Sequence, residues 1–268
     1  MTTNYHIRGP LVACLAFGIA PLCAGEAPDA VNFGAVRCEG SYADHLQGVC
    51  TNNRDAIYWS FTDVLVKTDV HGKPSHRKDV ASHHGDLCFR DGRLYVAVNL
   101  GKFNQPAGAA DSWIYVYDAN TLEELERKAV PQLVHGAGGI AFGDGRFIVV
   151  GGLPGGIDEN YLYELDESLT FRRRHVLASG HTLMGIQTAA FMDGSWWFGC
   201  YGVPKKLLKA DRAFGLLGKW DFDASLGIVG LPDGRLLVAR GARDPDGRRR
   251  GELKLAVPDE RHGLRLVE

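Results

Sequence analysis

Histidines recur in this 268-residue chain at a spacing that would suit one shared site. A short apolar phrase led by histidine begins at His45 and returns at residues 83–87, 135–140 and 181–187. A related copy at residues 225–229 begins with serine instead. Neutral imidazole is a common ligand of zinc, copper and iron, and it also serves as a general acid or base near neutral pH. Several imidazoles held together would therefore act either as ligands of a divalent transition metal or as an acid/base pair.

The same spacing predicts the elements that must hold these histidines. Each phrase is followed by a turn and a β-rich run, and self-similarity at about 40–50 residues is typical of propellers. Four of the five second strands follow an Asp-Gly pair, which is the strongest short hairpin signal. The third strands end at an aspartate in four units, and the fourth strands are more polar, as outer strands should be. The sequence thus predicts an all-β fold, a five-bladed β-propeller of four-stranded antiparallel blades.

The two ends of the chain have separate predicted roles. Residues 1–25 resemble a secretory signal peptide, because Arg8 precedes an apolar core at residues 11–20 that is too short for a comfortable membrane span. The chain would then be exported, to the periplasm or out of the cell. Residues 26–44 would lead into or close the ring, and residues 45–268 would form a single propeller domain. The four cysteines outside the signal would be free thiols or disulfides, for example between Cys38 and Cys50.

The net charge of the chain and the motifs that it lacks indicate which kinds of molecule it binds. A net charge of −2 with 23% charged residues gives no argument for nucleic acid or for an acidic membrane surface. The sequence contains no P-loop, GxSxG, HExxH or Rossmann fingerprint. We therefore expect a small-molecule or oligosaccharide substrate, no membrane span, and a monomer.

Propeller geometry brings the candidate residues to one face. First strands line the central channel, and the loops that lead into them open on the same face as the loops between second and third strands. Counting back from the second strands places His45 level with His83, and Gln47 level with Gly85 and Gln187. The predicted metal ligands are His45, His84, His135 and His181. The predicted catalytic residues are His84, His135 and Asp86. The predicted substrate-binding residues are Gln47, Gln187, Lys102, Asn104, Tyr201, Lys205 and Arg240.

Two segments resemble a known family. Residues 45–49 (HLQGV) and 116–123 (VYDANTLE) are similar to phrases of the plant and bacterial type of glutaminyl cyclotransferase, and weak similarity extends over most of residues 40–240. This resemblance implies a five-bladed propeller and an aminoacyl cyclisation activity. The family's catalytic acidic residue lies in an acidic-Gly phrase of the following blade, where this sequence has residues 83–86 (HHGD).

Three functions remain open at this point. The leading hypothesis is an exported lyase or hydrolase that acts on a small polar substrate, such as a saccharide, through the histidine-rich mouth. The alternatives are glutaminyl cyclotransferase-like cyclisation and a non-catalytic ligand-binding propeller. Five-bladed glycosidases need two or three carboxylates at the channel mouth. Asp86, Asp158 and Glu159 are the candidates, but only Asp86 lies at a first strand, so a metal-assisted or histidine-based lyase or hydrolase fits the histidine-rich mouth better.

Overall fold

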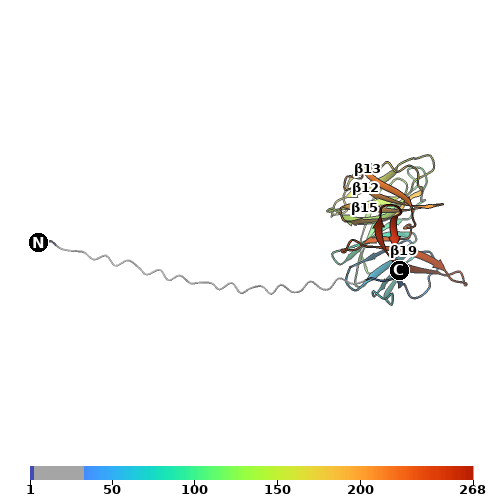
Figure 1. Cartoon of the computed structure of the whole chain (residues 1–268), viewed down its shortest axis with the longest axis horizontal. Helices are drawn as coiled ribbons and strands as arrows, with labels where there is room; N and C mark the ends of the chain where they lie inside the picture. The colour runs from blue at the N-terminus through green and yellow to red at the C-terminus, as the bar shows by residue number, and fades with distance from the viewer. Residues whose placement is uncertain (3–32, 268) are drawn as a thin grey trace.

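The computed structural model describes residues 1–2 and 33–267, and in this part of the chain five antiparallel sheets are arranged as the blades of a propeller (Figure 1). The predicted fold is confirmed. The predicted signal peptide lies outside the described residues except for its first two positions, so export stays a prediction. None of the described residues form a helix with the length and hydropathy required to cross a bilayer.

Four blades follow chain order from the channel outward. Blade 1 contains β2 (Gly48–Thr51), β3 (Ile57–Phe61), β4 (Val64–Thr68) and β5 (Pro74–Asp79). Blade 2 contains β6 (His84–Arg90), β7 (Arg93–Asn99), β8 (Ser112–Asp118) and β9 (Glu124–Ala129). Blade 3 contains β10 (Ala137–Gly143), β11 (Arg146–Gly151), β12 (Asn160–Leu165) and β13 (Phe171–Leu177). Blade 4 contains β14 (Leu183–Met192), β15 (Ser195–Gly202), β16 (Lys205–Ala210) and β17 (Leu216–Asp221).

The fifth blade closes the ring with both ends of the propeller. From the channel outward it contains β18 (Ile228–Gly230), β19 (Leu236–Arg243) and the long β20 (Arg249–Asp259). The outermost position of this blade is taken by β1 (Val36–Arg37) and β21 (Gly263–Leu266), which both pair with β20. β1 pairs with β20 at Leu253, and β21 pairs with β20 from Ala256 onward. The predicted closing segment therefore shares the outer position with the C-terminal strand, and the C-terminus lies beside the blue ribbon at the start of the propeller (Figure 1).

Turn chemistry explains why the strands begin and end where they do. Three of the four Asp-Gly hairpins place both turn residues at positive φ, for example Asp144 at 53° and Gly145 at 74°. In the fifth blade only Gly234 does so. The aspartates that end the third strands accept backbone N–H bonds two to four residues later. Asp211 Oδ1, for example, accepts from both Ala213 and Gly215 at 2.8 Å.

The core lies between blades rather than within them. Five clusters of buried apolar side chains each draw on two adjacent blades. Trp59, Trp196 and Trp197 are almost fully buried in three of them. Burial of these faces fixes each blade against its neighbours and gives the channel rigid walls.

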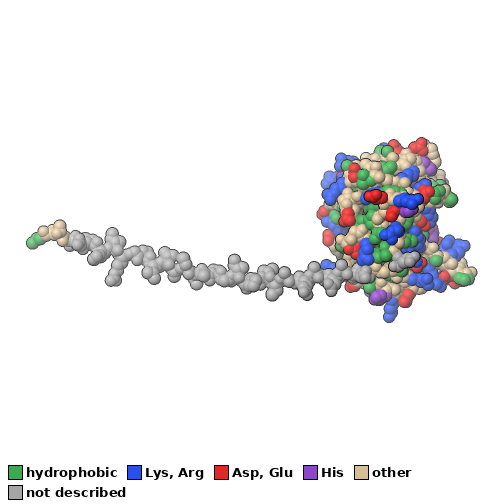
Figure 2. Space-filling model, viewed as in Figure 1, with side chains coloured by type: hydrophobic (Ala, Val, Ile, Leu, Met, Phe, Trp, Pro, Cys, Tyr) green, Lys and Arg blue, Asp and Glu red, His purple; other side chains and the backbone are tan. Residues whose placement is uncertain are grey.

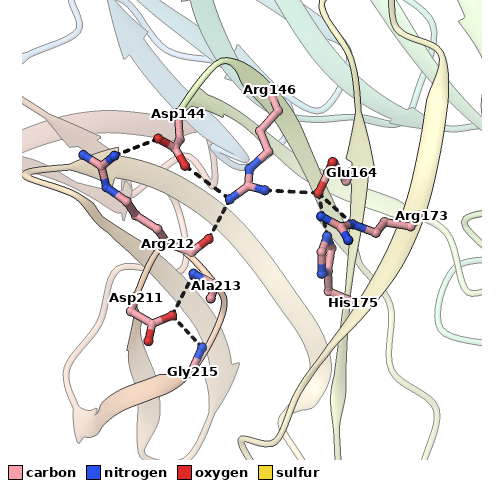
Figure 3. Close-up of polar contacts among 9 residues, drawn as sticks. All are labelled: Asp144, Arg146, Glu164, Arg173, His175, Asp211, Arg212, Ala213 and Gly215. Carbon is pink, nitrogen blue, oxygen red and sulfur yellow. Dashed lines mark hydrogen bonds and ion pairs between the residues drawn. The ribbon is translucent and has the colours of Figure 1, made fainter.

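A polar clamp joins blades 3 and 4 on the face that carries the Asp-Gly hairpins (Figure 3). Arg146 donates to Glu164 at 3.2 Å within blade 3 and to the Arg212 carbonyl of blade 4 at 2.6 Å. Arg212 in turn donates to Asp144 at 3.0 Å, and His175 contacts the same Glu164 oxygen at 2.6 Å. We define the polar clamp as these five residues.

The surface charges are mixed on the visible face, and the thiols are unpaired. On the face shown in Figure 2, basic and acidic side chains are interspersed rather than gathered by sign. The four cysteines of the described chain are free thiols, and Cys38 lies 3.3 Å from the Tyr42 hydroxyl instead of pairing with Cys50. The disulfide considered between Cys38 and Cys50 is therefore not formed in this structure.

Candidate functional site

A pocket of about 220 Å³ opens at the channel mouth, where the loops that lead into the first strands meet the loops between second and third strands. It draws on blades 1 to 4. Its lining consists of His45, Gln47, His83, Gly85, Asn99, Gly101, Phe103, Ala137, Gly138, Met184, Gln187 and Tyr201. We call this space the axial pocket. Four of its residues (His45, Gln47, Gln187 and Tyr201) are among those predicted from the sequence.

Small residues on the inner strands make room for the pocket. A Cβ on Gly85 would lie 2.3 Å from the Gly138 carbonyl oxygen, so no side chain fits where blades 2 and 3 come together. Gly138 contributes the facing wall. The polar side chains therefore surround an open space above closely packed backbone.

Two imidazoles and an amide form the polar centre of the axial pocket. The rings of His45 and His83 lie 6.3 Å apart, and Gln47 Nε2 lies 2.5 Å from His83 Nε2. Gln47 is buried and also contacts the Thr62 hydroxyl at 3.4 Å, which holds the amide in place. His83 itself is exposed to the mouth. The level register predicted for His45 and His83 is what brings their rings together.

Both imidazoles are shifted toward the neutral form. Burial is the main cause that lowers the pKa of His45, and the positive charges of His83 and Arg249 add to it, while Asp44 opposes them. Although part of the His83 side chain is open to the mouth, desolvation by the surrounding protein is the main cause that lowers its pKa, and Asp44 again opposes the shift. Two neutral imidazoles at neutral pH can accept a proton from a bound molecule.

The other polar side chains that line the axial pocket can both donate and accept hydrogen bonds. Gln187 and Asn99 are buried amides, and Gln187 Nε2 donates to the Met184 carbonyl at 2.7 Å. Tyr201 lies beside them, and burial raises the pKa of its phenol to about 12. Tyr201 is therefore protonated at neutral pH and can donate.

His84 does not line the axial pocket, and its ring lies against Tyr115 and Tyr117 of the apolar cluster between blades 1 and 2. It is fully buried, with Nδ1 2.6 Å from the Ala81 carbonyl and Nε2 2.7 Å from the Tyr117 hydroxyl. Since the carbonyl can only accept, Nδ1 donates and Nε2 accepts. Both ring nitrogens are engaged, so His84 has a structural place and lies outside the residues that line the pocket.

The other two predicted histidines also lie outside the lining. His135 is buried, donates from Nδ1 to the Gln105 carbonyl at 2.8 Å and has its ring beside Tyr161. His181 is exposed and donates to the Ile157 carbonyl at 2.9 Å. Across the described residues no group of three or more His, Cys, Asp or Glu side chains is arranged to hold a metal ion. The predicted four-histidine ligand set is thus not brought together, and metal binding stays a prediction.

Asp86 lies deeper in the channel than the pocket. Gly85 lines the axial pocket and Leu87 lines a cavity at the opposite mouth, so Asp86 stands between them. Its Oδ2 accepts from the Ala189 N–H at 3.0 Å, while Oδ1 has no hydrogen-bond partner among the described residues. Complete burial raises the pKa of this carboxyl well above its ordinary value. Asp86 joins the inner strands of blades 2 and 4 instead of lining the site.

The predicted substrate-binding residues on the loops have mostly structural partners. Lys205 and Arg240 are both paired with Asp223, at 2.8 Å and 3.7 Å. Asn104 Oδ1 accepts from the Leu153 N–H at 2.9 Å and so joins two loops. Lys102 is exposed at the rim beside Phe103, which does line the pocket.

Sequence reasoning missed several residues of the site. The predicted catalytic histidine of blade 2 is His84, whereas the pocket is lined by His83. The register that sets His83 level with His45 is the sequence signal that selects it. Asn99, Phe103 and Met184 lie in irregular loops or at strand ends, where no periodic pattern indicates their direction. Asp223, the partner of two predicted cations, carried no sequence signal.

Comparison with known proteins supports the fold. No protein-family model matches the sequence, and no curated protein matches it. Among solved structures, the glutaminyl cyclase of Myxococcus xanthus is similar with 12% identity and a TM-score of 0.56, over 88% of this chain and 100% of that one. The resemblance predicted from the sequence is confirmed at the level of the fold.

A second similar structure is the xylan β-1,4-xylosidase from Bacillus halodurans C-125, with 13% identity and a TM-score of 0.59. The match covers 86% of this chain and 56% of the xylosidase chain. At such identities both likenesses show a shared propeller architecture, and the chemistry must be argued from the site.

Proposed function

We propose that this protein is a lyase that acts on a saccharide in the axial pocket by histidine acid–base chemistry. The observation that carries the proposal is the His45–His83 pair, two imidazoles with lowered pKa values at the channel mouth, one of them held by Gln47. Amides that both donate and accept, and the ring of Phe103, suit a hydroxyl-bearing sugar ring.

Elimination fits these residues better than hydrolysis by paired carboxylates. No Asp or Glu of the described chain lines the axial pocket, whereas two-carboxylate hydrolysis needs a pair flanking the bond. In elimination, neutral His83 would take a proton from a carbon acidified by a neighbouring carboxyl-type group. The bond from the adjacent carbon to the leaving oxygen breaks, a C=C bond forms, and Tyr201 protonates the leaving oxygen. Solvent then returns the proton from His83 to Tyr201.

The test is a screen of acidic and neutral oligosaccharides for the ultraviolet absorbance of an unsaturated product. His83→Ala should lower kcat/KM by about 10²–10⁴-fold, the usual contribution of a general base. His76→Ala, an exposed histidine on β5, is the matched control and should leave kcat/KM unchanged. Wild-type rates in His83→Ala and in His45→Ala would exclude the imidazole pair. Elemental analysis of the purified protein tests the separate prediction of a bound transition metal.

Aminoacyl cyclisation is the second candidate. The amide-lined pocket and the likeness to a glutaminyl cyclase favour it, because an amide substrate would be matched by Gln47, Asn99 and Gln187. Release of ammonia from a peptide with N-terminal glutamine would support cyclisation in place of the lyase reaction.

A further inference from the structure

A second cavity adjoins the axial pocket on the fifth-blade side, and we call it the arginine annex. Its volume is about 390 Å³. It is lined by His45, Leu46, Tyr201, Leu226, Gly241, Ala242, Arg249 and Arg250. His45 and Tyr201 line both cavities, so a molecule in the axial pocket that extends past these two side chains reaches the annex.

Two arginines line the annex, and they differ in their partners. Arg250 is paired with Asp244, with Nε 2.7 Å from Oδ2. The half-buried Arg249 side chain makes no hydrogen bond or ion pair with any described residue, while its backbone is fixed by N–H and C=O bonds to Tyr42 at 2.8 and 2.9 Å. No Asp or Glu of the described chain lines this cavity. A fixed backbone with an unpaired guanidinium is suited to an anion.

We propose that the annex binds the carboxylate of an acidic sugar through Arg249, while the sugar ring occupies the axial pocket. The inference rests on the proposed function and names its substrate class, a uronate-containing oligosaccharide. Guanidinium matches a carboxylate with two parallel hydrogen bonds, which gives geometric selectivity as well as affinity. Neutralising the carboxylate would also acidify the neighbouring C–H, which is the proton that elimination removes.

Binding can be measured without turnover in the His83→Ala background, with trigalacturonate and its methyl ester as probes in isothermal titration calorimetry. The acid should bind more tightly than the ester. Adding Arg249→Gln should weaken binding of the acid by about 10–100-fold, because a charge-assisted bond is lost, and leave the ester unaffected. Arg248→Gln is the matched control, since this exposed neighbour contacts Ser41 and does not line the annex. Circular dichroism checks that each variant is folded.

Each outcome separates this inference from the lyase assignment. Equal affinity for acid and ester, no binding of either, or equal losses in the Arg249 and Arg248 variants would overturn the annex as a carboxylate site. If the protein turns over the acid but Arg249→Gln does not change its affinity for the acid, the annex is not the carboxylate site, and the lyase assignment is still supported. Arg249-dependent binding without any turnover in the otherwise wild-type protein would support the annex and refute the lyase.

Discussion

At the residue scale, the two adjacent histidines of blade 2 have opposite roles. His83 faces the axial pocket beside Gln47, whereas His84 opens β6 with its ring against Tyr117 in the core. Successive side chains of an extended segment point in opposite directions, so one of the two had to be internal. A buried histidine with both nitrogens engaged stabilises the blade, and an exposed one with a lowered pKa is available for chemistry.

His84 predicts how stability depends on pH. Burial lowers its pKa to about 4 in the folded protein, while the unfolded chain has the ordinary value of 6.5. The unfolded state therefore binds the proton more readily, and this part of the stability is present above pH 6.5 and is lost as pH falls toward 4. The loss amounts to about 3 kcal/mol at its limit.

Urea denaturation from pH 7.5 to 4.5 tests this. His84→Leu should be less stable than the wild type at pH 7.5, because it leaves the Tyr117 hydroxyl and the Ala81 carbonyl without partners, and its stability should fall less steeply on acidification. His76→Leu, at an exposed position, should keep the wild-type slope. If His84→Leu and the wild type have the same slope, the assignment of a buried neutral imidazole is wrong.

At the element scale, neighbouring blades depend on contacts that no single blade contains. The apolar clusters provide most of them, and the polar clamp adds directional bonds between blades 3 and 4 (Figure 3). Arg146 is the centre of the clamp because it bonds to Glu164 on its own blade and to a carbonyl of the next. Its guanidinium also lies over the ring of Phe214 at 5.1 Å.

Arg146→Ala should destabilise the fold by about 1–3 kcal/mol, because Glu164 and the Arg212 carbonyl lose a half-buried charged partner. Arg172→Ala is the control, since its pair with Asp166 is on the exposed surface and should contribute about 0–1 kcal/mol. Guanidinium denaturation at neutral pH measures both. Equal losses in the two variants would show that the clamp is no stronger than a surface ion pair.

At the scale of the whole molecule, the ring is closed by a segment that precedes the first blade. Val36 on β1 pairs with Leu253 on β20 and is buried in the cluster between blades 5 and 1. Tyr42 pairs with Arg249, which lines the arginine annex. Closure of the ring and the shape of the annex are therefore coupled through one short stretch of chain.

Val36→Asp should lower the thermal midpoint strongly, since an unpaired charge would be buried where the ring closes; we expect a loss of several kcal/mol. Arg37→Ala, on the exposed side of the same strand, should leave the midpoint nearly unchanged. Differential scanning calorimetry gives both values. If Val36→Asp unfolds at the same thermal midpoint as the wild type, β1 does not stabilise the closure of the ring.

The sequence by itself determined the number of blades, the position of the second strands and the register that sets His45 level with His83. These features follow from local patterns, namely apolar periodicity and the positive φ demanded by Asp-Gly turns. Only the tertiary structure decided which of His83 and His84 faces the pocket. It also decided that Asp223 forms ion pairs with Lys205 and Arg240. Side-chain direction at a strand end and pairing between distant loops depend on contacts that are remote in the chain, so no local pattern could fix them.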